Sequence, residues 1–262
     1  MSNLIKRILL IICCFSISLG LSAQDLPYLK NSTFNAGEII KYKLKYGFFT
    51  AAEASIKVIE TDVKFDNKPT YHLSVQGTTS GTFDIFYKVR NRYDSYIDKK
   101  TFTPYLYTES IREAKYRRAD KARFYQSEQK VIAKKGTFTS PANQTFDLVS
   151  AYYFARNLDL SSTKVGDKFT IYYFIDDEVT PLTIEYIGVE TIRTSLGKIR
   201  CLKFSPSIKP GRVFRKDSKL YLWVSDDANR IPVKAQAELL VGSIIMEISE
   251  ASGLNQPLIP NF

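Results

Sequence analysis

Hydrophobic and polar residues alternate with a period of two along most of the chain. Ile40, Tyr42, Leu44 and Tyr46 fall on one face of their segment, and the intervening lysines fall on the other. This alternation is typical of a half-buried β-strand. Similar strand-like runs cover residues 52–58, 71–75, 83–98, 104–111, 122–125, 131–133, 168–175, 179–187, 191–194, 199–204, 220–224, 231–241 and 244–250. The pattern predicts an all-β protein, mainly antiparallel.

One segment changes period. Between Gln144 and Leu160, apolar residues recur at helical spacing, with Thr145 as a possible cap and Asp147 in the first turn. We therefore expect a curved antiparallel sheet that forms an open or closed β-barrel, with one α-helix packed against it. The chain has no evident linker, so residues 24–262 are predicted to form a single domain with loose ends at about 24–33 and 253–262.

The first 23 residues have the order of an export signal. Lys6 and Arg7 precede an apolar run, and small residues lead up to Ala23, where cleavage is expected. The run is shorter than the roughly 20 residues that a membrane span needs. The sequence thus predicts an exported, periplasmic protein whose mature chain has no transmembrane segment.

The cysteines fit this view. Cys13 and Cys14 lie inside the signal, close behind its basic residues, where lipidation is not favoured. Cys201 would then be the one cysteine of the mature chain, so an intramolecular disulfide is not possible there. It lies in a strand-like run and is expected to be a buried structural thiol.

Basic residues outnumber acidic ones. The formal charge is +10, and it becomes +8 without Lys6 and Arg7. A basic surface can meet anionic lipid, acidic glycan or nucleic acid, and export makes nucleic acid the least accessible of these. Basic residues are dense between Arg112 and Lys135. They indicate either a partner surface, represented by Arg117, Arg118 and Lys121, or charged edge strands that resist aggregation.

Motifs for catalysis are missing from the sequence. His72 is the only histidine, which excludes multi-histidine metal sites, and neither a GxSxG elbow nor a phosphate-binding loop occurs. The run Asp176-Asp177-Glu178 fits a solvated acidic turn between two strands. The sequence therefore predicts a non-enzymatic protein without a metal or cofactor.

Aromatic residues suggest a binding role. A curved sheet with inward aromatics can enclose an apolar cavity, although the same residues can also fill a core. The candidate ligand-binding residues are Tyr42, Tyr46, Tyr87, Tyr93, Tyr173 and Trp223, with Arg90 and Arg92 near a headgroup. Two functions stay open: a binding protein for an apolar or lipid-like ligand, and an envelope assembly factor that contacts a protein or glycan through its basic face.

Several short stretches resemble a known family. They are residues 34–38, the helical run from Asp147 to Tyr152, Gly166-Asp167, Val213-Phe214, residues 222–227, Arg230 to Lys234, and Val241 to Ser243. Together they are similar to DUF3108, a family of exported bacterial proteins with no assigned function. The resemblance implies a periplasmic, mostly antiparallel β protein and supplies no catalytic residues. The hairpin around Trp223 and Ile231 also resembles that of lipoprotein carriers of the LolA type, which are half-barrels around an apolar cavity.

Overall fold

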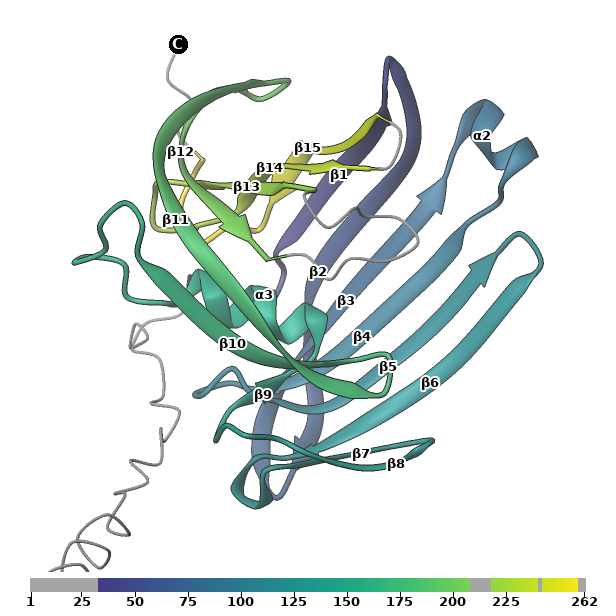
Figure 1. Cartoon of the computed structure of the whole chain (residues 1–262), viewed down its shortest axis with the longest axis vertical. Coiled ribbons are helices and arrows are strands. Elements are labelled where there is room, and N and C mark those ends of the chain that lie inside the picture. The colour runs from purple at the N-terminus through teal and green to yellow at the C-terminus, as the bar shows by residue number, and fades with distance from the viewer. Residues whose placement is uncertain (1–32, 208–217, 240–241, 259–262) are drawn as a thin grey trace, which may run out of the picture.

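A computed structural model describes residues 33–207, 218–239 and 242–258. These residues form one curled sheet of 15 strands that does not close into a barrel (Figure 1). The strands are β1 (Ile39–Tyr46), β2 (Phe49–Phe65), β3 (Lys68–Thr79), β4 (Arg90–Asp98), β5 (Pro104–Glu113), β6 (Tyr116–Tyr125), β7 (Lys130–Ala133), β8 (Gly136–Thr139), β9 (Thr145–Phe146), β10 (Lys168–Ile175), β11 (Glu178–Thr194), β12 (Gly197–Pro206), β13 (Leu220–Ser225), β14 (Pro232–Glu238) and β15 (Ser243–Ser252). The predicted fold class is confirmed.

The sheet consists of two meanders joined in its middle. Strands β1 to β8 follow one another outward from the middle on one side, and β10 to β15 follow one another inward to the middle on the other. The junction is the antiparallel pairing of β1 with β15, in which Tyr42 lies opposite Ile248. Within the described part of the chain, every pair is antiparallel except β9 with β10. Sequential strands pair because short hairpin turns keep neighbours adjacent.

The two edge strands, β8 and β9, follow one another in sequence but lie at opposite ends of the strand order. The curl brings the β10–β11 turn over β6 to β8, where side chains close the seam. Phe174 packs against Phe124 and Phe138, with ring centroids 6.4 and 5.1 Å apart. Arg118 contacts Asp176 across the same seam at 3.0 Å. Side-chain contacts thus bridge the seam of the open sheet, where its strands are not paired by backbone hydrogen bonds.

The alternation in β1 is confirmed. Ile40 and Tyr42 are buried, whereas Lys41 and Lys43 are exposed. The prediction of one strand over residues 83–98 was wrong in its first part. A short helix, α2 (Gly81–Phe86), precedes β4, and Asp84 ties it to Thr79 and Arg90. These short-range side-chain contacts outweigh the strand-like alternation of the segment.

The predicted packed helix is present but shorter than expected. It is α3 (Leu148–Arg156), and its cap is Asp147 rather than Thr145, which belongs to β9. The Asp147 carboxylate accepts from the backbone N–H groups of Val149 and Ser150, and the Ser150 hydroxyl accepts from the Asp147 N–H. This reciprocal arrangement is a capping box. A 3-10 turn, η1 (Gln126–Glu128), links β6 to β7.

Helix α3 fills the inside of the curl. Tyr153 and Phe154 are fully buried and pack in the main core with Phe34, Leu73 and Ile97 from the sheet and its N-terminal lead. The predicted signal at residues 1–23 lies outside the described residues. Among those described, the helices are all too short or too polar to span a bilayer.

Candidate functional site

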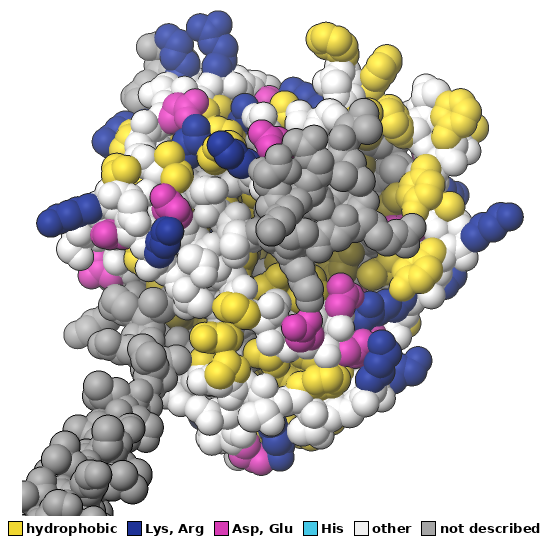
Figure 2. Space-filling model, viewed as in Figure 1, with side chains coloured by type: hydrophobic (Ala, Val, Ile, Leu, Met, Phe, Trp, Pro, Cys, Tyr) yellow, Lys and Arg dark blue, Asp and Glu magenta, His cyan; other side chains and the backbone are white. Residues whose placement is uncertain are grey.

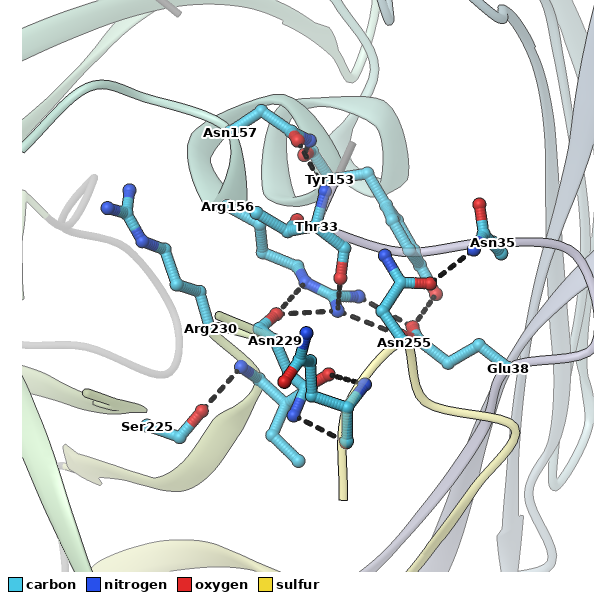
Figure 3. Close-up of polar contacts among 12 residues, drawn as sticks. Thr33, Asn35, Glu38, Tyr153, Arg156, Asn157, Ser225, Asn229, Arg230 and Asn255 are labelled. Carbon is cyan, nitrogen blue, oxygen red and sulfur yellow. Dashed lines mark hydrogen bonds and ion pairs between the residues drawn. The ribbon is translucent and has the colours of Figure 1, made fainter. Parts of the chain in front are cut away.

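A buried ion pair lies at the C-terminal end of α3. Arg156 donates to both carboxylate oxygens of Glu38, at 2.6 and 2.8 Å, and both side chains are almost completely excluded from solvent (Figure 3). Arg156 also donates to the backbone oxygens of Asn229 and Thr33, at 2.8 and 3.3 Å. The Tyr153 hydroxyl donates to Glu38 at 3.2 Å. All three nitrogens of the Arg156 guanidinium therefore donate to acceptors within the protein.

The cluster joins segments that are far apart in sequence. Thr33 donates its N–H to Asn157 at 2.9 Å, and Gln256 donates its N–H to the Asn229 side chain at 3.1 Å. Asn35 donates to Asn255 at 2.5 Å (Figure 3). The lead into β1, the end of α3, the β13–β14 turn and the segment after β15 thus meet at one point. Residues 253–258, expected to be loose, make contacts here.

Burial shapes the electrostatics of this cluster. Burial lowers the pKa of Arg156, but Tyr152 and the hydrogen bond to Glu38 outweigh it and hold that pKa above its ordinary value. Burial, reinforced by the Glu38 charge, raises the pKa of Tyr153 well above its usual range. Arg156 therefore stays charged and Tyr153 stays neutral at physiological pH, so the cluster suits a structural role better than proton transfer.

An apolar cavity of about 50 Å³ lies beside this cluster, between α3 and β10 to β13. Its walls are mainly Ala155, Leu158, Leu160, Phe169, Ile184, Phe204, Leu222 and Val224. Arg156 and Arg230 border it. Arg230 turns away from the ion-pair cluster (Figure 3) and donates one N–H to the Leu158 carbonyl oxygen. The cavity thus combines apolar walls with a half-buried cation.

Arg230 differs from Arg156 in its partners. Burial lowers the pKa of Arg230, with Asp159 and Asp226 acting against it. None of the ion pairs found within residues 33–207, 218–239 and 242–258 involves Arg230. A partly desolvated guanidinium without a paired carboxylate favours an anionic group nearby. Arg230 is therefore a half-buried cation at the cavity wall that is in no ion pair among the described residues.

The predicted ligand-binding aromatics do not meet at this cavity. Tyr42 is buried near Tyr152 and Tyr153, and burial, with those two neighbours, raises its pKa. Tyr93 and Tyr173 pack at the margin of the main core. Trp223 is buried, donates to Glu190 at 3.0 Å, and lies under the ammonium groups of neighbouring lysines.

The remaining four candidates lie on the surface. Tyr46 and Tyr87 are exposed near one end of the sheet. Arg90 donates to both oxygens of Asp84, and Arg92 donates to both oxygens of Asp94, which also contacts His72 at 2.7 Å. Successive strand residues point to opposite faces, so Arg92 faces away from the core beside which Tyr93 lies. The eight candidates therefore do not form one site.

The predicted partner surface is also divided. Arg118 bonds Glu109, Asp120 and Asp176 at the seam. Arg117 is exposed and donates to two backbone oxygens, one of them at Ala114. Lys121 borders an open groove of about 800 Å³ over β5 to β7, together with Leu106, Thr108, Arg123, Tyr125, Ile132 and Lys134.

Sequence reasoning missed Glu38, Arg156, Asn229 and Arg230 as a group. A signal was present for part of the group, because Glu38 and Arg230 lie in stretches that carry the family resemblance. Arg156 and Asn229 lie outside those stretches. In the fold these stretches converge on the buried cluster. Cys201 is buried as predicted.

The fold and site define a half-open β-barrel that wraps around one capped helix. The chain belongs to DUF3108, a family described as proteins of unknown function, whose model matches residues 41–249. A β-barrel-like protein of the DUF1849 family from Brucella abortus has a similar fold, with a TM-score of 0.56 and 8% identity over 85% of this chain and 99% of that one.

Two further solved structures match with lower TM-scores, and the descriptions of both proteins are provisional. One is a lipoprotein from Parabacteroides distasonis, with a TM-score of 0.38 and 12% identity over 87% of this chain and 100% of that one. The other is an exported protein with a YmcC-like fold from Bacteroides fragilis, with a TM-score of 0.37 and 9% identity over 87% and 99%. A search of curated proteins gives no match.

Proposed function

We propose that the protein is an exported, non-enzymatic binding protein that holds an amphipathic ligand with an apolar tail and an anionic end. The tail would occupy the cavity between α3 and β10 to β13, and the anionic end would contact Arg230. The observation that carries this proposal is the cavity itself, an apolar space bordered by a half-buried guanidinium without a carboxylate partner among the described residues. Export is supported by the pattern of residues 1–23.

The size of the cavity defines how binding would work. A volume of about 50 Å³ is well below the roughly 300–1,000 Å³ of most ligand pockets. An alkyl tail must therefore displace side chains of the wall. Leu160, Phe169 and Leu222 are only partly buried, so these are the wall side chains that would move. The seam closed by side chains allows the same widening.

A fatty acid titration tests this proposal. Oleate should bind the protein, and native mass spectrometry should show added mass that is lost on denaturation. Arg230→Gln should weaken oleate binding about tenfold, as expected for the loss of a charge-assisted hydrogen bond. Ala155→Phe, which fills the cavity, should abolish it. Arg193→Gln, at an exposed arginine on β11, is the matched control. Unchanged binding by both cavity variants would rule out this site.

A second candidate rests on the open groove over β5 to β7. Lys121, Arg123 and Lys134 border an apolar floor that includes Leu106 and Ile132, which suits an acidic glycan or protein partner at the envelope. Binding of the polyuronate alginate should then weaken with added salt, because exposed charges are screened within about 10 Å. Lys121→Glu combined with Lys134→Glu should remove it, and Lys168→Glu should not. Alginate binding that changes neither with added salt nor with these charge reversals contradicts this role.

A further inference from the structure

Large apolar side chains project into solvent at one end of the sheet. Phe48 is fully exposed in the β1–β2 turn, and Phe49 beside it is 67% exposed. Ile85 and Phe86, in α2, are 82% and 81% exposed. Hydrophobic side chains gather in Figure 2 at the end of the molecule where Figure 1 draws α2. Single exposed apolar residues are ordinary, but such a group indicates an interaction site.

The two segments form one surface. Strand β2 pairs with β3, and Ser80 donates its N–H to the Ala51 carbonyl oxygen at 3.4 Å, so α2 lies beside the β1–β2 turn. The rings of Phe49 and Phe83 are 6.4 Å apart. Phe48, Phe49, Ile85 and Phe86 are called the apolar tip below.

Helix α2 is held in a way that keeps its apolar side outward. None of its residues is buried, so packing does not explain why a helix of 6 residues forms there. Its polar side is anchored instead. Asp84 accepts from Thr79 at 2.6 Å and from two nitrogens of Arg90 at 2.6 and 2.9 Å. The protein thus uses a specific polar contact to present Ile85 and Phe86 to solvent.

Basic residues surround the apolar tip. Ala114 donates its N–H to the Lys88 carbonyl oxygen at 2.7 Å, which places the β5–β6 turn and Lys115 beside α2. Lys88, Lys115 and Arg117 are exposed, and no ion pair found among the described residues uses them. Asp84, by contrast, is neutralised by Arg90. The margin of the tip is therefore positively charged.

We propose that the apolar tip inserts into an anionic lipid surface. Insertion would bury Phe48, Phe49, Ile85 and Phe86 about 5–10 Å deep at the boundary of headgroups and acyl chains. Lys88 and Lys115 would then contact anionic headgroups, because juxtamembrane basic residues are attracted to an anionic lipid surface. A membrane fits better than a protein partner because the apolar residues project from two separate turns and line none of the described cavities. This docking is independent of the ligand cavity beside α3.

Vesicle sedimentation tests the inference. The protein is used with the N-terminus that the producing cell leaves, as defined by mass spectrometry. It should sediment with vesicles of phosphatidylcholine and phosphatidylglycerol, and much less with phosphatidylcholine alone. Phe48→Ser combined with Phe86→Ser should weaken partitioning about tenfold or more. Lys88→Glu combined with Lys115→Glu should remove the preference for anionic vesicles.

A matched variant controls for loss of surface apolarity. Val63→Ser combined with Val165→Ser changes two exposed apolar residues outside the tip and should leave sedimentation unchanged. Unchanged Trp223 fluorescence verifies that each variant is folded. Equal sedimentation of the tip variant and the unaltered protein overturns the proposal. Failure of the unaltered protein to bind either vesicle also overturns it.

Discussion

Arg156 and Glu38, separated by 118 residues in sequence, form a doubly hydrogen-bonded ion pair from which water is excluded. Removal of one partner leaves the other charge buried and unpaired, which costs about 3–5 kcal/mol. Arg156→Met should therefore lower the free energy of unfolding by about that amount, as measured by urea denaturation.

The double replacement separates pairing from packing. Glu38→Leu with Arg156→Met should be less destabilising than Arg156→Met alone, because it leaves no unpaired charge. Lys168→Met breaks the exposed pair with Glu185 and should cost at most about 1 kcal/mol. If Arg156→Met lowers the free energy of unfolding by no more than Lys168→Met does, the buried pair does not hold the fold together.

Asp147 should make stability depend on pH. Burial raises its pKa, although Ser95 and Ser150 partly offset this. The protonated carboxyl of Asp147 is thus favoured in the folded state. Its contribution to the free energy of unfolding is complete below the pKa that Asp147 has in the unfolded chain, and it is lost as pH rises through the pKa of the folded state. Asp147→Asn keeps the cap and removes the titration. Measured by urea denaturation, the free energy of unfolding of Asp147→Asn relative to that of the unaltered protein should therefore be higher at neutral pH than at acidic pH.

The cap itself has a separate test. Asp147→Ala removes the acceptor for the Val149 and Ser150 N–H groups and should cost about 1–2 kcal/mol at neutral pH. If Asp147→Asn proves as unstable as Asp147→Ala, the charge matters more than the hydrogen bonds.

Cys201 should be chemically silent in the folded protein. Burial, aided by Asp227 and Asp226, raises the pKa of its thiol to about 12, and the thiolate is the reactive form. In a variant with Cys13 and Cys14 replaced by serine, a disulfide reagent at pH 8 should react only as fast as the protein unfolds. Rapid labelling without denaturant would contradict the buried position.

The seam should open when its aromatic contact is removed. Phe174→Ala eliminates the contacts with Phe124 and Phe138 and should cost about 3 kcal/mol. Hydrogen exchange should rise in β8, which pairs only with β7, and stay slow in β1 and β15. Val189→Ala, at an exposed β11 residue, serves as the control. Uniform acceleration would mean that the seam is not an independent unit.

Strand positions could be predicted where burial is one-sided. Ile40 and Lys41 differ in burial because they face opposite sides of β1, and the sequence alternates accordingly. The same rule fails at α2. Ile85 and Tyr87 also alternate, yet both are exposed, because the Asp84 contacts with Thr79 and Arg90 impose a helical turn. The alternation of apolar and polar positions carries no information about side-chain hydrogen bonds of this kind, even between residues as near in sequence as Asp84 and Arg90.

The site was less predictable than the fold. Glu38, Arg156 and Asn229 lie in separate segments, and only the joining of two meanders brings them together. Arg92 and Tyr93 show a limit of another kind. Adjacent residues on a strand face opposite sides, so the sequence already indicated that both could not line one cavity.

The pairing of β1 with β15 has a consequence for how the chain folds. Lys41 and Glu250, joined at 2.8 Å, are 209 residues apart, whereas the other strands of each meander find partners nearby. Contacts of such long range form slowly. Each meander can grow hairpin by hairpin during synthesis, but β1 keeps one open edge until β15 emerges. An open edge can pair with other chains, so the interval before β15 emerges is the one in which β1 is exposed to intermolecular strand pairing.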